Sequence, residues 1–366
     1  MTAITRLTLT DFRNHAHSDI QTGSNGGGGL VAISGDNGAG KTNILEAISL
    51  LAPGRGLRGT ALSDAARQGG PGGWSVAATL ITAAGEVQLG TGTQAGAPDR
   101  RLVRVNGASA SAAALADWMA LVWLTPAMDR LFADSASARR RFLDRLVLAL
   151  HPGHGQRVSR YEAAMRERTR LLTGEAPADP VWLSGLEADM AEHGAAIAAA
   201  RADVVAALSE ALAAAPDGPF ARPLIALAGN DAADLGARLA QRLAAGRARD
   251  AAAGRAIEGP HRADLMVHHA EKAMPAASCS TGEQKALLVA IVLAHAALVA
   301  RRSGQPPILL LDEIAAHLDR RRVLALFERL ADMGAQAWLT GTDPALFRLA
   351  DGARLLHIEA GQIMPA

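Results

Sequence analysis

The stretch "GDNGAGKT", Gly35 to Thr42, constrains the fold of this chain more than any other feature. It follows the apolar segment "LVAIS" and precedes the helix-like segment "NILEAISLL". Glycines at these positions let backbone N–H groups turn inward around phosphate oxygens, and the start of the following helix adds a positive dipole end. The motif therefore predicts a strand, a phosphate-binding loop (P-loop) and a helix, in which Lys41 reaches the β- and γ-phosphates of a nucleoside triphosphate.

The segment "PPILLLDE", which ends at Glu313, supplies the acidic groups that such a loop requires. Its apolar run is typical of a buried parallel strand, and ligands of open α/β sheets bind at the carboxyl ends of strands. We expect Asp312 and the Thr42 hydroxyl to hold Mg²⁺, and Glu313 to polarise the attacking water. The predicted catalytic residues are therefore Glu313, Lys41 and Asp312, and the predicted cofactors are ATP and Mg²⁺.

Composition narrows the class of protein. The 366 residues are 49% hydrophobic and 20% charged, as in ordinary globular proteins, and the formal net charge is +1. Any nucleic-acid site must therefore rest on local arginine patches. A single cysteine, Cys279, excludes a disulfide framework and a CxxC zinc site. The N-terminus lacks a signal-peptide pattern and the longest apolar run, 286–300, is shorter than a membrane span, so we expect a cytoplasmic protein with no membrane partner.

Strand-like segments open and close the chain, and a segment rich in Ala, Arg, Leu and Glu interrupts them. The segments "ITRLTLTDF", "GWSVAATLITAAGEVQLGTG" and "RRLVRVNGASA" predict strands, the last two in an antiparallel layer. The interrupting segment predicts several helices. We therefore expect an α/β fold. We expect 1–132 plus 256–366 to form one discontinuous ABC-type ATPase head, a mixed sheet with flanking helices, and 133–255 to form an inserted, mostly helical lobe.

The stretch "STGEQ", which begins at Ser280, resembles the signature motif of the ABC ATPase superfamily. In that superfamily the turn caps a long helix and faces the γ-phosphate of ATP bound by the other subunit. The residues suit that task, because Ser280 offers a hydroxyl, Gly282 leaves a backbone N–H uncovered and the helix dipole points at the anion. The resemblance also implies a D-loop that ends at Asp319, and a switch residue at Thr342 where most members have histidine.

Longer segments resemble the RecF family of bacterial DNA replication and repair proteins, which is an SMC-type branch of the ABC ATPases. The matching segments are "LTLTDFRNH", "GDNGAGKTNILEAI", "GRGLRG", "LTP", "RRRFLD", "EGPHRADL", "STGEQKALL", "LLLDEIAAHLD" and "TGTD". They span nearly the whole chain in family order, and "RRRFLD" and "EGPHRADL" discriminate best. The resemblance implies a slow, DNA-stimulated ATPase that forms an ATP-dependent homodimer, binds single-stranded and double-stranded DNA, and supports RecA loading with RecO and RecR.

The motifs and the resemblance together assign two sets of contact residues. The residues expected to bind ATP are Gly35, Asp36, Asn37, Gly38, Ala39, Gly40, Lys41, Thr42, Asn43, Arg13, Ser280, Gly282, Glu283, Gln284, Asp319 and Thr342. The residues expected to bind DNA are Arg55, Arg58, Arg139, Arg140 and Arg141. Arginine clusters neutralise phosphates without reading the sequence of bases, but they also occur as solvated helix faces.

Some alternatives stay open. Relatives often carry a glutamine before the "TP" turn and an acid after it, where this chain has about Val122 and Ala127. The missing glutamine leaves room for an ATP-gated DNA scaffold that does not hydrolyse ATP, although Glu313 argues against that reading. A transporter ATPase normally has the glutamine and the switch histidine, and a zinc-hook ATPase needs a long coiled coil and a CxxC pair. His261 in "EGPHRADL" is either structural or close to the nucleotide.

Overall fold

The computed structural model describes residues 2–23, 29–229, 232–314, 318–350, 352–359 and 361–365. They form two compact units. The first unit consists of 1–129, 215–221 and 280–366, and the second consists of 130–214 and 222–279.

The second unit is larger than the expected insertion of 133–255, and this corrects the predicted boundary. Residues 256–279 belong to the second unit because they contain strand β10 (Asp264–His269), which pairs with β9 (Pro223–Ala228) inside that unit. A strand is fixed to its sheet by the ladder of backbone hydrogen bonds, so β10 carries its neighbours with it.

The first unit contains a six-stranded mixed sheet in the order β15-β14-β3-β13-β12-β8. Its strands are β3 (Leu30–Gly35), β8 (Leu121–Leu124), β12 (Ile308–Leu311), β13 (Ala337–Gly341), β14 (Arg354–Glu359) and β15 (Gln362–Pro365). The strands are parallel except for β15, which is antiparallel to β14. Strands β8, β12 and β13 are buried throughout, which explains their apolar sequences.

A second six-stranded sheet of the same unit is antiparallel, in the order β2-β1-β4-β5-β6-β7. Its strands are β1 (Ala3–Phe12), β2 (His15–Gln21), β4 (Trp74–Thr82), β5 (Gly85–Gln94), β6 (Ala97–Val105) and β7 (Ala108–Ser109). Helix α1 (Lys41–Ser49) contacts β1 of this sheet and β3, β12 and β13 of the mixed sheet, so it lies between the two. The predicted antiparallel layer is confirmed.

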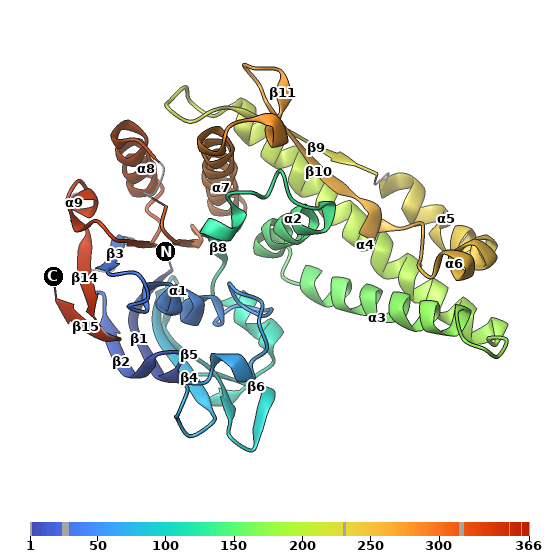
Figure 1. Ribbon diagram of the computed structural model, residues 1–366, viewed down its shortest axis with the longest axis horizontal. Helices are drawn as coiled ribbons and strands as arrows, with labels where there is room; N and C mark the ends of the chain where they lie inside the picture. Colours follow the sequence, from blue (N-terminus) through green and yellow to red (C-terminus); the bar gives the residue numbers. More distant parts are fainter. Residues whose placement is uncertain are drawn as a thin grey trace. The chain divides into compact units, whose positions relative to one another are not determined.

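Three further helices of the first unit are α7 (Thr281–Ser303), α8 (Arg320–Asp332) and α9 (Pro344–Phe347). Figure 1 shows α7 and α8 on the side of the parallel strands opposite α1. Within the described part of the chain, α7 is the one helix long and apolar enough to span a membrane. About two thirds of its most apolar window, 67%, is buried inside the protein, as in the core helix of a soluble protein.

The second unit consists of helices and a small sheet. Its helices are α2 (Ala136–Leu150), α3 (His154–Leu172), α4 (Pro180–Ala213), α5 (Ala232–Ala245) and α6 (Arg247–Ala253). Figure 1 shows α3 and α4 side by side. The sheet has the order β11-β10-β9, where β11 is Met274–Pro275, and sequence patterns did not predict it because β9 is short and alanine-rich. Short 3-10 helices of the two units are Ser63–Ala65, Ala112–Asp117, Pro126–Met128, Pro260–Arg262 and Ala276–Ser278.

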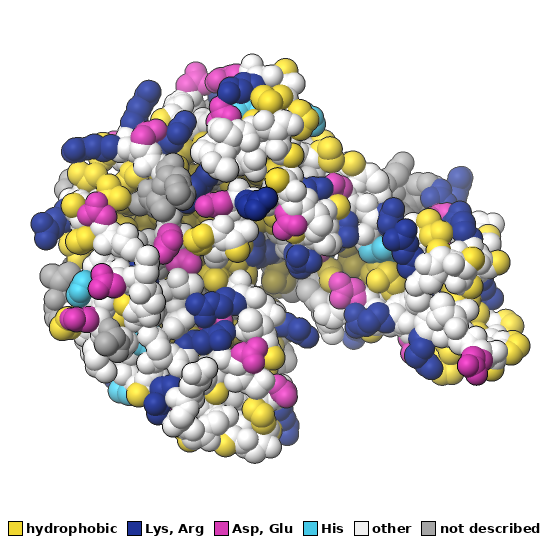
Figure 2. Space-filling model, in the orientation of Figure 1, with side chains coloured by type: hydrophobic (Ala, Val, Ile, Leu, Met, Phe, Trp, Pro, Cys, Tyr) yellow, Lys and Arg dark blue, Asp and Glu magenta, His cyan; other side chains and the backbone are white. Residues whose placement is uncertain are grey.

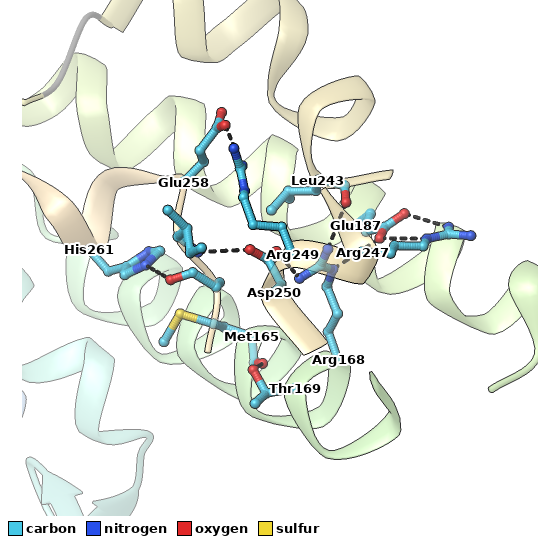
Figure 3. Close-up of polar contacts among 12 residues, drawn as sticks. Met165, Arg168, Thr169, Glu187, Leu243, Arg247, Arg249, Asp250, Glu258 and His261 are labelled. Atoms are coloured by element: carbon cyan, nitrogen blue, oxygen red, sulfur yellow. Dashed lines mark hydrogen bonds and ion pairs between the residues drawn. The ribbon is translucent and has the colours of Figure 1, made fainter. Parts of the chain in front are cut away.

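A buried network of charges joins the helices of the second unit (Figure 3). Arg168, which is fully buried, donates to Glu187 at 2.9 Å, to Asp250 at 2.7 Å and to the carbonyl of Leu243 at 2.7 Å. Arg247 donates to both oxygens of Glu187, at 2.9 and 2.6 Å. Two guanidinium groups thus balance two carboxylates, and such pairing is what makes buried charges tolerable.

Candidate functional site

The P-loop lies between β3 and α1, as the motif predicts. Gly38 and Gly40 have φ values of +85° and +111°, a left-handed backbone that glycine adopts without strain. A side chain at Gly35 would place its Cβ 2.3 Å from the carbonyl oxygen of Ile358, so the loop must also be glycine there. The Lys41 amine donates to the carbonyls of Gly35 and Asp36, at 2.8 and 2.9 Å. The loop backbone therefore curls around the lysine amine at the start of α1.

The acidic end of β12 meets the P-loop helix. The Thr42 hydroxyl is 2.9 and 3.1 Å from the two carboxylate oxygens of Asp312. A hydroxyl and a carboxylate are hard oxygen ligands of the kind that Mg²⁺ takes, alongside water and phosphate oxygens. The two predicted metal ligands are thus brought together, from positions 270 residues apart in sequence, and they fit the predicted ion.

Glu313 follows Asp312 and lines a pocket of about 180 Å³. The pocket also contains Asn37 of the P-loop and Thr342, with further residues of the segment from β13 to α9. Asp343 caps α9 by accepting a hydrogen bond from the N–H of Ala345 at 2.9 Å. The expected water-activating residue, the P-loop and the switch position therefore share one small concave site.

The signature turn forms the predicted cap of α7. The Ser280 hydroxyl accepts a hydrogen bond from the Glu283 N–H at 3.4 Å, and the Glu283 carboxylate accepts one from the Ser280 N–H at 3.0 Å. This reciprocal pair is a capping box. The capping box explains why a glutamate stands at position 283. It does not explain the glycine at position 282, where a Cβ would have no atom within 4 Å. Ser280 is exposed and Gln284 is buried, so the mouth of the helix presents Ser280 and the half-buried Gly282.

Arg13, expected to bind ATP, holds helix α1 to the segment Ser63–Ala65 in this structure, and its contact with ATP stays a prediction. Its guanidinium donates to both carboxylate oxygens of Glu46, at 2.9 and 2.5 Å, and to the carbonyl of Asp64 at 2.7 Å. Asn14 is the residue of this segment that touches the P-loop. Its amide donates to the Ala39 carbonyl at 3.0 Å, and its oxygen accepts from Asn43 at 2.6 Å.

Asp319, expected in the D-loop, is the N-cap of α8. Its carboxylate accepts a hydrogen bond from the N–H of Arg322 at 2.9 Å. Residues 315–317 of the predicted D-loop lie outside the described part of the chain. The nearby segment 215–221 packs here too, because Arg322 donates to the carbonyl of Pro219 at 3.0 Å.

The predicted DNA-contacting arginines divide into two groups. Arg55, Arg58 and Arg141 are exposed, and Arg58 also donates to Glu46 at 2.5 Å. Arg139 forms a bidentate pair with Asp264, which raises the pKa of the arginine through that hydrogen bond. Figure 2 shows basic side chains scattered among acidic and apolar ones over the visible face.

Arg140 is half-buried and also has a partner inside the second unit. It donates to the Ala263 carbonyl at 2.9 Å, and burial lowers its pKa. Both Arg139 and Arg140 bind the "EGPHRADL" segment, and their contact with DNA stays a prediction. The two most discriminating segments of the sequence face each other in the second unit.

His261 is structural, which resolves an alternative that the sequence left open. Its Nε2 is 2.9 Å from the Ala256 carbonyl, which can only accept, so this nitrogen carries the proton. The Tyr161 hydroxyl then donates to Nδ1, 2.7 Å away. Both ring nitrogens are thus engaged inside the second unit, and burial lowers the pKa of the imidazole.

Two residues that the sequence patterns did not assign lie at the catalytic end of the sheet. Thr340 of β13 contacts Asp312 and the backbone of Glu313. Lys285 of α7 is buried beside Asp129 and the Glu313 carbonyl. The available signals were a hydroxyl inside the apolar strand "AWLTG" and one of only three lysines in the chain.

Comparison with known proteins agrees with this geometry. The model of the family "RecF/RecN/SMC N terminal domain" matches residues 3–361. A solved structure described as the recombination mediator protein RecF-ATPrS in the RecFOR pathway has a TM-score of 0.85 at 21% identity, covering 99% of this chain and 97% of that one. An Smc head domain from Pyrococcus furiosus has a TM-score of 0.57 at 19% identity, covering 99% and 95%. The fold and the family define an ABC-type ATPase head of the SMC class.

Curated relatives give the branch of that class. The DNA replication and repair protein RecF of Mesorhizobium japonicum is 54% identical over 100% of this chain and 98% of its own length. The RecF protein of Rhizobium etli is 50% identical over 99% and 98%. The chain belongs to the RecF family of DNA replication and repair proteins.

Proposed function

We propose that the protein is a slow, DNA-stimulated ATPase of the cytoplasm, which dimerises on ATP, binds duplex and gapped DNA and supports RecA loading with RecO and RecR. The observation that carries this proposal is the contact between Thr42 and Asp312, which joins the P-loop to the acidic end of β12. Solved RecF structures named for bound ATP and for the RecFOR pathway support it by analogy.

Different residues bind the phosphates, hold the metal ion and orient the attacking water. The P-loop N–H groups and Lys41 hold the phosphates of ATP, and Thr42 with Asp312 holds Mg²⁺, which neutralises charge on the phosphates. Glu313, in the same pocket as Asn37 and Thr342, orients the water that attacks the γ-phosphate. All of these groups belong to the same protomer.

The signature turn completes the site of a second protomer. The exposed hydroxyl of Ser280 and the N–H of Gly282, whose Cβ position is open, bind the γ-phosphate held by the partner at the positive end of α7. Loss of the γ-phosphate then removes the ligand that joins the two chains, and the dimer loosens. The exposed Arg55 and Arg141 supply phosphate contacts to DNA.

Light scattering on Glu313→Gln tests this proposal. With ATP and Mg²⁺ the variant is expected to have twice the monomer mass and to retain a gapped duplex, and with ADP it is expected to be monomeric. A monomer in ATP without bound DNA contradicts the proposal. A dimer that retains DNA, combined with no phosphate release by the wild-type protein, indicates the non-hydrolysing scaffold instead.

Substitutions at Ser280 separate the phosphate contact from helix capping. Aspartate is as good an N-cap as serine, but it places a negative charge where the γ-phosphate binds. Ser280→Asp is therefore expected to keep the melting temperature and lose the ATP-dependent dimer, whereas Ser280→Thr keeps both. Dimerisation of Ser280→Asp equal to wild type means that the turn is only a cap.

A further inference from the structure

The backbone of Glu313 is in an unusual conformation. Its φ is +47°, in the left-handed region that residues other than glycine rarely adopt. A non-glycine residue in that region costs on the order of 1 kcal/mol and persists where neighbouring groups hold it. The contacts at the two ends of this residue therefore decide where its carboxylate points.

Thr340 holds the N–H end. Its hydroxyl oxygen accepts a hydrogen bond from the Glu313 N–H at 2.9 Å and donates to the Asp312 carboxylate at 2.7 Å. The roles are fixed, because a carboxylate accepts and a backbone N–H donates. The residue is fully buried on β13, between β3, which leads into the P-loop, and β12, which leads into Asp312. One hydroxyl therefore sets the positions of both acidic residues.

Lys285 lies at the carbonyl end. Its amine is 3.4 Å from the Glu313 carbonyl oxygen and 3.4 Å from a carboxylate oxygen of Asp129. The lysine is 3% exposed, so its charge needs the partner that Asp129 provides. Since Lys285 stands on the first turns of α7, it joins the signature helix to the backbone of Glu313.

We propose that Thr340 is a positioning residue for hydrolysis, which holds Asp312 and Glu313 in their working orientation, and that Lys285 supports the Glu313 carbonyl from α7. This inference rests on the proposed ATPase function. Thr340 acts through the two acids, and outer-shell partners of this kind typically change metal affinity or activity by roughly 10- to 100-fold.

The experiment compares Thr340→Val, which keeps the shape and removes the hydroxyl, with Thr340→Ser, which keeps the hydroxyl. Thr340→Val is expected to lower kcat for ATP hydrolysis roughly 10- to 100-fold with a smaller change in KM, and Thr340→Ser to restore most of it. Binding of a fluorescent ATP analogue, titrated with Mg²⁺, gives a readout apart from turnover. The Mg²⁺ concentration at half-saturation is expected to rise about tenfold in Thr340→Val.

Thr93 offers a matched control. It is 7% exposed on β5, and its hydroxyl has no hydrogen-bond partner among the residues that the structure describes. Thr93→Val is expected to leave turnover and the Mg²⁺ titration unchanged. A loss confined to Thr340→Val is then due to the missing Thr340 hydroxyl and not to the replacement of a buried threonine by valine in general. Melting temperatures of all variants show which of them are folded.

Several outcomes are decisive. A Thr340→Val protein that is folded and equals wild type in kcat and in the Mg²⁺ titration overturns the inference. Equal loss in the valine and serine variants also overturns it, because the serine hydroxyl should suffice. A wild-type protein that neither binds nor hydrolyses ATP contradicts the proposed function instead, and the two failures are thereby told apart.

Lys285 is tested in the same way. Lys285→Met is expected to lower kcat while nucleotide affinity stays within about threefold of wild type, since the contacts of its amine are to Asp129 and the Glu313 carbonyl. Pairing it with Asp129→Asn removes the stranded carboxylate and should recover folding stability but not kcat. A double variant with wild-type kcat shows that the lysine serves stability alone.

Discussion

Arg139 and Asp264 form a bidentate ion pair that joins helix α2 to strand β10 across 125 residues of sequence. The Arg139 Nε and Nη2 atoms lie 2.8 and 2.7 Å from the two carboxylate oxygens of Asp264. The two side chains are 16% and 21% exposed, so water screens them only partly. Arg139, an arginine of a family motif, therefore stabilises the packing of α2 against β10 within the second unit.

We expect Arg139→Met to lower the free energy of unfolding by about 2 kcal/mol, because it strands a partly buried carboxylate. Urea unfolding measures the change, and a double-mutant cycle with Asp264→Asn isolates the pair. Arg141→Met on the same helix is the control. Its exposed side chain predicts a change within about 0.5 kcal/mol. An Arg139→Met protein of wild-type stability and reduced affinity for DNA would contradict the structural role and support the DNA contact predicted for Arg139.

Two glycines of helix α4 give opposite expectations for alanine. Gly185 has no atom within 4 Å of its Cβ position, so Gly185→Ala should stabilise the protein by about 0.5–1 kcal/mol through helix propensity. At Gly194 the same methyl would lie 2.9 Å from Leu239 and 3.2 Å from the Tyr161 ring. Gly194→Ala should therefore destabilise by about 1 kcal/mol or more. Thermal melts of both variants decide the matter, and stabilisation of similar size at both positions would contradict the packing of α4.

His261 predicts that stability falls in mild acid. Burial lowers the pKa of His261 below the ordinary value of 6.5. The hydrogen bond to the Ala256 carbonyl raises the pKa in part, and the nearby charges of Arg262 and Arg140 lower it further. The unfolded chain therefore takes up a proton that the folded chain resists. Stability from this group is complete above about pH 6.5 and is lost as the pH falls through and below that value.

The measurement is the fall in melting temperature between pH 7.5 and pH 5.5, a window above the titration of ordinary carboxylates. His261→Gln, which does not titrate, should reduce that fall. It should not abolish it, because burial also lowers the pKa of His15 in the first unit. A His261→Gln protein with the wild-type pH dependence would mean that the imidazole gains its proton without loss of stability.

Sequence patterns predicted the parts of the fold in which a local signal coincides with a structural need. The P-loop, the acidic strand end and the capped turn of α7 are short motifs whose residue types are fixed by phosphate or by the helix terminus. The contact of Thr42 with Asp312 follows from the rule that parallel strands end at one edge of a sheet.

The side-chain partners that the sequence did not reveal have a common physical origin. Arg13, Arg139 and Arg140 are arginines in matching segments, and a sequence does not say which carboxylate or carbonyl a guanidinium will find. Glu46, Asp264 and the Ala263 carbonyl lie 33, 125 and 123 residues away along the chain. The sheet of β9 and β10 was missed for a similar reason, because its pairing joins segments with weak local strand signals.

The buried charges around Arg168 bear on how the second unit can vary over evolution. Alanine-rich helices such as α4 present nearly the same surface at many positions along their length, so apolar packing distinguishes poorly between one register and the next. Arg168, Glu187, Arg247 and Asp250 satisfy one another in the arrangement seen. We therefore expect alanine positions of this unit to drift freely among relatives, while these four positions change only together.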